Sequence, residues 1–271
     1  MLDQPDLRGG PIPTGRVFVD LHCHTNASFD SLSDPRSVAR AASTRGLTHL
    51  AITDHDRIDA AVALRDAAPE GLTIIVGEEV KTADGDLICL FLTRAVPPGR
   101  PVGETIAMVR DQGGLVGIPH PYDRFRNSML RLPASRAGQS HAGSLAARPL
   151  RLRDEGLASL AGLVDWVESY NARLLGGGNE RAAVFAKENG LPGIAVSDAH
   201  SVMEVGVAYT LMNGNPGTPE GLRAALTSAE MVVGRASYVT RGLTPVAKLV
   251  QRARGNRRVQ PSGTADRSDG R

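Results

Sequence analysis

The stretch that decides the fold is RVFVDLHCHT, residues 16–25. Its first half is a run of apolar and β-branched residues, which favours a β-strand. Two histidines, His22 and His24, follow directly, and side chains two residues apart in an extended chain point the same way. We therefore expect both imidazoles to reach one metal ion at the end of this strand.

The same rhythm continues outward from this stretch, because short apolar runs alternate with helical patterns. We expect strands at residues 16–21, 47–53, 72–80, 86–92, 114–119, 163–169, 193–197 and 207–212. Helices are expected near residues 35–46, 59–68, 103–112, 179–189, 218–228 and 244–254. Repeated strand–helix units indicate parallel pairing with right-handed crossovers. Their number favours an α/β barrel, with a doubly wound sheet as the structural alternative. The turn at Asp84-Gly85 is the exception and predicts a hairpin-like pair.

Histidines and carboxylates gather where the predicted strands end. Five of the seven histidines are there, together with three carboxylates: His22, His24, Asp30, His55, Glu79, His120, Asp198 and His200. In a β/α barrel these ends meet at one rim, where active sites lie. Nitrogen and oxygen ligands without a thiolate pair indicate zinc, manganese or iron. One tetrahedral ion cannot use so many ligands, so we expect two or three ions, with Glu79 able to bridge two of them. Clustered metals of this kind suit the hydrolysis of phosphate esters.

Five short motifs carry a family resemblance. They are DLHCHT (20–25), TDHD (53–56), GEE (77–79), PHP (119–121) and SDAH (197–200). In this order and spacing the chain resembles the PHP family, named for polymerase and histidinol phosphatase, from about residue 17 to 212. The resemblance implies a distorted (β/α)7 TIM-like barrel. It also implies two or three divalent ions (Mn²⁺, Zn²⁺ or Fe²⁺) at the C-terminal rim of the strands.

The resemblance also implies a ligand set. The first metal would be held by His22, His24, Glu79 and Asp198, and the second by Glu79 and His120. The third would be held by Asp30, His55 and His200. Asp86 stands where the family often has a further histidine ligand, so it is taken as an oxygen ligand of the second metal. Asp30 is preferred to Asp34, which better fits a helix N-cap.

The function expected from this set is phosphate-ester hydrolysis by a hydroxide activated on a di- or trinuclear metal site. The expected substrates are nucleoside phosphates and short oligonucleotides, with histidinol phosphate as another candidate. His55, Asp54 and His200 are the expected catalytic residues: His200 or Asp54 would carry a proton to the leaving group, or Asp54 would orient His55. Arg124 and Arg126, and then Arg173, are the expected clamps for the substrate phosphate.

Two other functions stay open. An amidohydrolase also uses an HxH motif, but often bridges its metals with a modified lysine. The three lysines here are Lys81, Lys187 and Lys248, and none ends a middle strand of the predicted barrel. The other alternative is a non-catalytic metal-binding barrel, which the loss of several ligands would signal.

Composition sets the wider expectations. Of the 271 residues, 41% are hydrophobic and 22% are charged, as in ordinary globular proteins. No apolar run is long enough for a membrane helix, and the N-terminus lacks the pattern of a secretory signal. Only two cysteines are present, so a disulfide framework is excluded and a cytoplasmic location is expected. The expected partner is a phosphorylated small molecule or short oligonucleotide, with no membrane and no obligate protein partner.

Charge divides the chain unevenly. Residues 124–153 carry seven arginines and no acid, and residues 251–271 have a net charge of +4. Because the whole chain has +2, the rest carries −9. We expect a flexible segment at 1–15, a barrel at 16–250 with a basic insertion at 124–153, and a disordered basic tail at 251–271.

Overall fold

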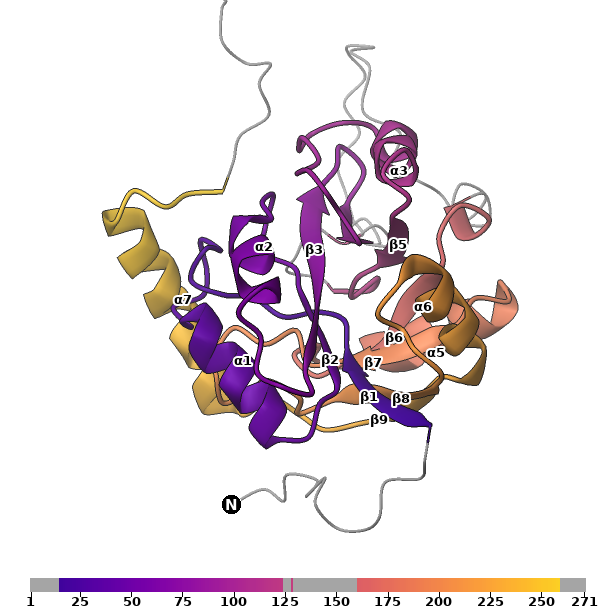
Figure 1. Cartoon of the computed structure of the whole chain (residues 1–271). Helices are drawn as coiled ribbons and strands as arrows, with labels where there is room; N and C mark the ends of the chain where they lie inside the picture. Colours follow the sequence, from indigo (N-terminus) through magenta and orange to yellow (C-terminus); the bar gives the residue numbers. More distant parts are fainter. Residues whose placement is uncertain (1–14, 124–127, 129–159, 259–271) are drawn as a thin grey trace, which may run out of the picture.

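The computed structural model describes residues 15–123, 128 and 160–258 of the chain. Its strands are β1 (Arg16–Asp20), β2 (His49–Ile52), β3 (Thr73–Lys81), β4 (Asp86–Leu90), β5 (Leu115–Ile118), β6 (Trp166–Asn171), β7 (Gly193–Val196), β8 (Tyr209–Asn213) and β9 (Glu230–Val232). Its helices are α1 (Pro35–Thr44), α2 (Asp59–Arg65), α3 (Val102–Arg110), α5 (Gly178–Glu188), α6 (Pro219–Ala225), the 3₁₀ turn η1 (Leu226–Ser228) and α7 (Tyr238–Ala253). Figure 1 shows their arrangement.

The strands of the described residues form one sheet in the order β7-β6-β5-β4-β3-β2-β1-β8-β9. Strands β1, β2 and β3 are parallel to one another, and so are β5, β6 and β7. Strand β4 is antiparallel to both of its neighbours, which confirms the hairpin expected at Asp84-Gly85. Strand β8 is also antiparallel to β1. The expectation of parallel pairing is therefore wrong for β4 and β8. For β4 the reason is the short turn at 82–85, which joins it directly to β3 as a hairpin.

The sheet curves until its two halves nearly meet. Thr210 of β8 joins the halves, because its hydroxyl accepts the amide of Ala195 of β7 and donates to that residue's carbonyl, both at 2.9 Å. Just beyond β1, the amide of His24 donates to the carbonyl of Ala199 at 2.9 Å. This closure confirms the expected distorted barrel and brings the ends of β1 and β7 together.

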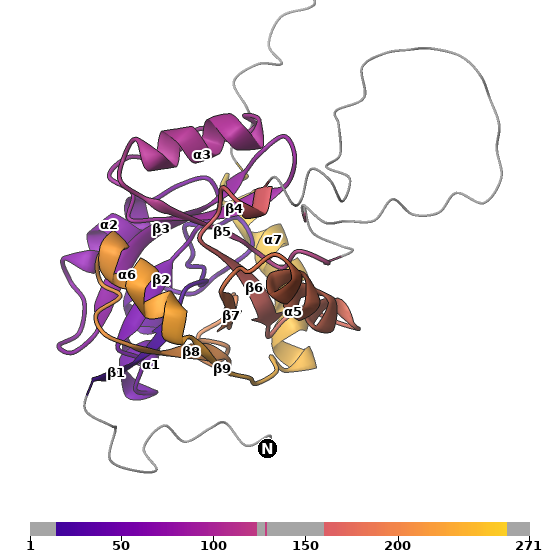
Figure 2. The ribbon, with the colours of Figure 1, turned by 90° about the vertical axis from the view of Figure 1, so that its right-hand side faces the viewer.

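The core has two faces. Successive residues of the strands alternate between them: Ile74 and Val76 belong to one hydrophobic cluster, whereas Ile75 belongs to the other. The outer cluster includes residues of α1, α2, α3 and α5, and the inner one is completed by Leu222 and Ala225 of α6. Figure 2 shows α3 lying outside β3, β4 and β5.

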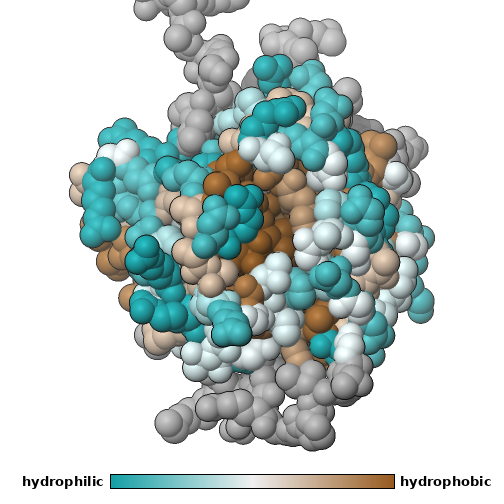
Figure 3. Space-filling model, viewed as in Figure 1, coloured by the Kyte–Doolittle hydropathy of each residue, from teal (hydrophilic) through white to brown (hydrophobic). Residues whose placement is uncertain are grey.

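A glycine makes room for the largest inner side chain. A Cβ atom on Gly117 of β5 would lie 2.1 Å from Cε2 of Trp166 on β6, so any larger residue would displace the indole. Trp166 is fully buried and fills the barrel interior. Seen from outside, hydrophobic side chains occupy a hollow near the middle of one face, and hydrophilic residues surround it (Figure 3).

Helix α1 begins as its sequence predicts. The Asp34 carboxylate accepts the amide of Ser37 at 2.9 Å, and Pro35 occupies the first turn. Asp34 is therefore an N-cap. No helix within the described ranges combines the length and apolar character needed to cross a bilayer.

The C-terminal segment differs from the expected tail. Helix α7 continues to Ala253, Gln251 is 2% exposed, and Arg258 forms ion pairs with the body of the protein. The tail expected from residue 251 is thus wrong for residues 251–258, because their polar side chains bind backbone and carboxylate groups beside the barrel rim. The expected segments at 1–14 and 259–271, and all of 124–153 except Ser128, lie outside the described residues.

Candidate metal centre

The eight expected ligands with strand-end positions come together at one end of the barrel. His22 and His24 follow β1, His55 follows β2, Glu79 belongs to β3, His120 follows β5, and Asp198 and His200 follow β7. Asp30 comes from the loop between β1 and α1. Each of the eight is at most 9% exposed. Burying so many ionisable groups is costly unless a cation or a hydrogen bond compensates them.

One group is centred on Glu79. Its Oε2 atom lies 3.3 Å from Nε2 of His22 and 3.3 Å from Nε2 of His24. Its other oxygen, Oε1, lies 3.0 Å from Nε2 of His120. Asp198 Oδ1 lies 3.6 Å from both Nε2 atoms of the HxH pair. Glu79 therefore faces two sets of ligand atoms, as a bridging carboxylate would.

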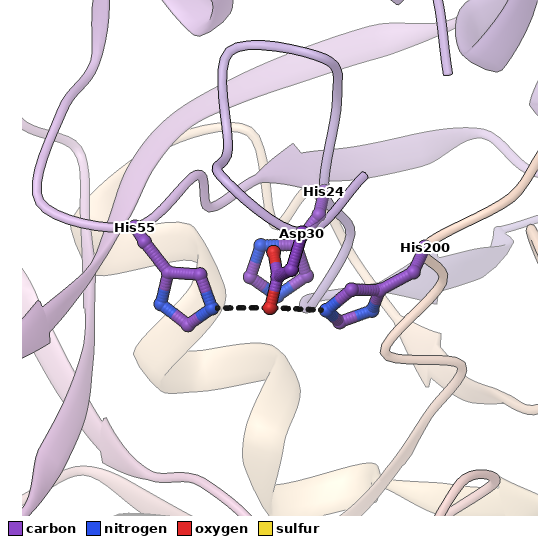
Figure 4. Close-up of side chains that lie close together, drawn as sticks. All are labelled: His24, Asp30, His55 and His200. Atoms are coloured by element: carbon purple, nitrogen blue, oxygen red, sulfur yellow. Dashed lines mark hydrogen bonds and ion pairs between the residues drawn. The ribbon is translucent and has the colours of Figure 1, made fainter. Parts of the chain in front are cut away.

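A second group is centred on Asp30. Its Oδ2 atom lies between Nε2 of His55, at 3.3 Å, and Nε2 of His200, at 3.2 Å (Figure 4). The ring of His24 lies behind this carboxylate, with its centroid 4.3 Å from that of His200. Ligand atoms of His24, Asp30, His55 and His200 all lie within 4.8 Å of one another. In the described part of the chain, Asp30 Oδ1 is buried without a hydrogen-bond partner, so this carboxylate has a spare ligand atom.

The outer ring nitrogens of three histidines are held by acceptors. His22 Nδ1 lies 2.6 Å from the carboxylate of Glu168, and His200 Nδ1 lies 2.9 Å from the carbonyl of Asp198. A carbonyl only accepts, so His200 Nδ1 must carry the proton. His24 Nδ1 lies 3.1 Å from the hydroxyl of Ser28, whose own proton goes to Asp54. Nε2 of each ring is consequently directed inward.

These inward nitrogens meet other electron-rich atoms. Nε2 of His22 and Nε2 of His24 are 2.9 Å apart, and both face Glu79. Such an arrangement is stable only with a cation among the atoms, either a metal ion or a proton on a ring. The residues present therefore fit a cluster of divalent ions with nitrogen and oxygen ligands.

The electrostatics agree with this fit. Burial alone would lower the pKa of His24, but Asp198 and Glu79 outweigh it and raise that pKa to about 9. Burial alone would raise the pKa of Asp30, but His200 and His55 hold it well below its usual range. The centre thus attracts positive charge strongly.

Two candidate ligands have unusual backbone conformations. The φ angle is 27° at His120 and 52° at Asp198, in a region that residues other than glycine seldom adopt. Strain of this kind persists where surrounding structure over-determines it, and it is common at functional sites.

Several supporting residues were not expected from the sequence. Glu168 on β6 binds His22, and its other oxygen accepts the amide of His120 at 2.8 Å. The side-chain amide nitrogen of Asn171, Nδ2, donates to the carboxylate of Glu168 at 2.8 Å and to that of Asp198 at 2.9 Å. In the sequence Glu168 is one of several polar residues in the expected strand at 163–169, and Asn171 lies beyond it, so no local pattern singled them out.

Asp54 holds a loop of the site. Its carboxylate accepts three hydrogen bonds, from the amide and hydroxyl of Thr25 at 2.6 and 2.7 Å and from Ser28 at 2.9 Å. Both oxygens are therefore used to hold the loop that carries Asp30. Ser28 links this carboxylate to His55, because its hydroxyl also accepts the amide of His55 at 3.1 Å. Of the two roles expected for Asp54, these contacts favour orienting His55 over proton transfer.

Asp86 also has another partner. Its Oδ1 atom lies 3.0 Å from Nη2 of Arg258, whose Nε lies 2.8 Å from Asp56. A guanidinium therefore supplies the positive charge beside this carboxylate, and we expect Asp86 to serve as its ion-pair partner instead of as the ligand expected from the sequence.

Of the three expected phosphate clamps, only Arg173 lies among the described residues. Arg173 donates to Glu204 at 2.6 Å and to Thr244 at 2.7 Å. Glu204 in turn accepts the amide of His200 at 3.1 Å. Arg173 is therefore corrected from a clamp to a residue that supports the His200 loop. Arg124 and Arg126 lie outside the described residues.

Comparisons with known proteins cover most of this architecture. The family model of the PHP domain matches residues 20–164, and the PHP-associated model matches residues 176–231. Two uncharacterized proteins of Methanocaldococcus jannaschii are similar to the chain. One is 37% identical over 114 residues, which are 38% of this chain and 67% of that protein. The other is 31% identical over 192 residues, which are 70% of this chain and 68% of that protein.

A solved structure shares the fold. It is a two-domain protein from Bacteroides vulgatus that contains a predicted PHP-like metal-dependent phosphoesterase. The TM-score is 0.63 at 18% sequence identity, and the match covers 83% of this chain and 67% of that one.

Proposed function

The chain belongs to the PHP family, and from that premise we propose that it hydrolyses phosphate esters with the help of two or three divalent metal ions. Nucleoside phosphates and short oligonucleotides are the proposed substrates. One observation carries the proposal: the Nε2 atoms of His22, His24 and His200 and the carboxylates of Glu79 and Asp30 are directed at common points.

The clusters suggest how the ions would be shared. His22, His24, Glu79 and Asp198 would hold one ion, and Glu79 with His120 would hold a second. Asp30, His55 and His200 would hold a third. When bound, such ions supply Lewis acidity toward phosphoryl oxygens and lower the pKa of water to near neutral values.

The protein's own residues prepare this chemistry. Glu168 and the Asp198 carbonyl fix the orientation of the His22 and His200 rings, so the ligands need not reorganise when an ion binds. His200 has its Nδ1 tied to that carbonyl and its Nε2 directed at Asp30. Both ring nitrogens of His200 would be occupied when it holds a metal ion, so it could not deliver a proton. We therefore propose His55 and His200 as metal ligands and assign no proton transfer to His200.

The experiment is a phosphate-release screen on metal-free protein and on protein loaded with Mn²⁺ or Zn²⁺. The set contains p-nitrophenyl phosphate, nucleoside phosphates, short oligonucleotides and histidinol phosphate, with an amide substrate as a control. Metal-dependent release of phosphate, reversed by a chelator, is the expected result. Cleavage of the amide alone would indicate an amidohydrolase, and bound metal without any hydrolysis would indicate a non-catalytic barrel.

Chelation has an expected effect on stability as well. A ligand at a hundred times its Kd adds about 3 kcal/mol to the free energy of unfolding. For a domain of this size the melting temperature should fall by roughly 5–10 °C when the metal is removed, and differential scanning fluorimetry measures the shift.

A further inference from the structure

A basic pocket lies beside the metal centre. It has a volume of about 480 Å³ and is lined by Phe29, Lys248, Arg252, Asn256, Arg257 and Arg258. Four of these six side chains are cationic and none is a carboxylate. A hollow with one sign of charge focuses the electric field and raises the local concentration of anions.

Phe29 forms the boundary between the pocket and the metal centre. It precedes Asp30 in the chain, and its ring centroid lies 4.9 Å from that of His55. On the pocket side, Lys248 Nζ lies 5.5 Å and Arg258 Cζ lies 5.9 Å from the same centroid. A molecule with one end at the metal ligands can therefore reach the pocket across a single aromatic ring.

The pocket is built on a fixed support. The side-chain amide of Gln251 donates to the carbonyls of Asn26, Ser28 and Ser31 at 2.7, 3.0 and 2.7 Å. The side-chain amide of Asn256 donates to the carbonyls of Asn26, Ala27 and Ser28 at 3.3, 3.0 and 3.3 Å. These contacts join residues 251–256 to the loop that carries Asp30, so the pocket and the metal centre keep a fixed spacing.

The four cationic side chains of the pocket differ in their exposure and in their ion pairing. Arg258 is 17% exposed and already pairs with Asp56 and Asp86. Lys248, Arg252 and Arg257 are exposed and face solvent. Their charge is available to an incoming ligand, and a guanidinium matches the oxygen geometry of a phosphate.

We propose that this pocket binds a non-reacting phosphate group of a substrate whose reacting phosphate lies at the metal centre. The substrate class is then phosphate esters that carry at least two phosphates. The kinetic part of this proposal rests on the proposed phosphoesterase function, whereas the binding of an anion to the pocket does not.

Binding is tested first, on metal-free protein, with inorganic pyrophosphate as the probe and isothermal titration calorimetry as the measurement. Without metal the centre is rich in carboxylates and repels anions, so binding reports on other sites. The double variant Arg252→Gln/Arg257→Gln should weaken binding at least tenfold. The matched double variant Arg94→Gln/Lys187→Gln removes two exposed charges outside the pocket and should change the Kd less than twofold. Equal losses in both variants, or no binding by the parent protein, would overturn the proposal.

Kinetics separate this proposal from the proposed function. The ratio of kcat/KM for a nucleoside bisphosphate to that for the matching monophosphate should fall about tenfold in the pocket variant and stay constant in the control variant. Hydrolysis with an unchanged ratio would refute the pocket while leaving the phosphoesterase intact. Pocket-dependent pyrophosphate binding without hydrolysis of either ester would support the pocket and refute the phosphoesterase.

Discussion

The carboxylate of Glu168 lies 2.6 Å from Nδ1 of His22, although 146 residues separate them in the chain. The contact fixes the ring of His22 and directs its Nε2 toward His24 and Glu79. Burial alone would lower the pKa of His22, but Glu168, Asp198 and Glu79 together raise it well above its ordinary value. The position that attracts a proton in this way also attracts a metal ion.

Replacing this carboxylate should weaken metal binding without abolishing it. We expect Glu168→Gln to lower the metal affinity by about 10–100-fold, because the ring loses its charged hydrogen-bond partner. Competition with a chelator of known affinity measures the change, and excess metal should restore activity. Glu188→Gln, at an exposed carboxylate on α5, is the matched control. Equal affinities in both variants would exclude this role.

Loss of a direct ligand should be more severe. We expect His22→Ala and Asp198→Asn each to reduce kcat at least tenfold even with saturating metal, since losing a metal contact costs several kcal/mol in the transition state. Asparagine is chosen at position 198 because it tolerates the φ angle of 52° found there. Circular dichroism should show intact folds. More than about a tenth of the parental kcat in either variant would count against the ligand assignment.

Gln251 should matter for activity although it belongs to the expected tail. Gln251→Ala leaves the carbonyl of Ser31 without this donor, and those of Asn26 and Ser28 keep only Asn256, which we expect to cost about 1–3 kcal/mol in stability. A displaced Asp30 should also lower kcat by about tenfold or more. Gln112→Ala is the control, because Gln112 holds a different loop through the amides of Thr93 and Arg94. The control should lose stability only; loss of activity in both variants would show that destabilisation alone is responsible.

The pairing of Asp86 with Arg258 predicts a change in stability rather than in metal content. Asp86→Asn removes one of the two carboxylates that neutralise this guanidinium, and a loss of about 1–3 kcal/mol is expected in chemical denaturation. Elemental analysis should give the same metal-to-protein ratio as in the parent. A lower ratio would restore Asp86 to the ligand set.

His49 predicts a pH dependence of folding. Burial lowers its pKa in the folded protein, and a hydrogen bond with Asn215 offsets part of this effect. Above the unfolded pKa of about 6.5 the ring is neutral in both states, so it contributes nothing there. As the pH falls below that value, the unfolded state binds the proton first and the free energy of unfolding decreases. His49→Gln should flatten this part of the stability profile between pH 5 and 7. Identical profiles for the parent and the variant would contradict the prediction.

The sequence by itself determined the strand ends and the candidate ligands. His22 and His24 follow an apolar run whose periodicity is local, and the choice of Asp30 over Asp34 depended on a capping pattern of a few residues. Such features are decided by neighbours along the chain, so composition and spacing reveal them. The order of the five motifs then indicated the family and the barrel.

The tertiary structure alone decided which distant groups meet. Glu168 reaches His22, Thr210 closes the barrel against Ala195, and Arg258 takes the carboxylate of Asp86. Each of these contacts depends on strand direction, register or the path of α7, which a local pattern does not encode. The same reason explains why residues 251–258, polar and basic like a solvated tail, belong to the wall of the site. Their side-chain hydrogen-bond partners lie 172 to 230 residues away in the chain.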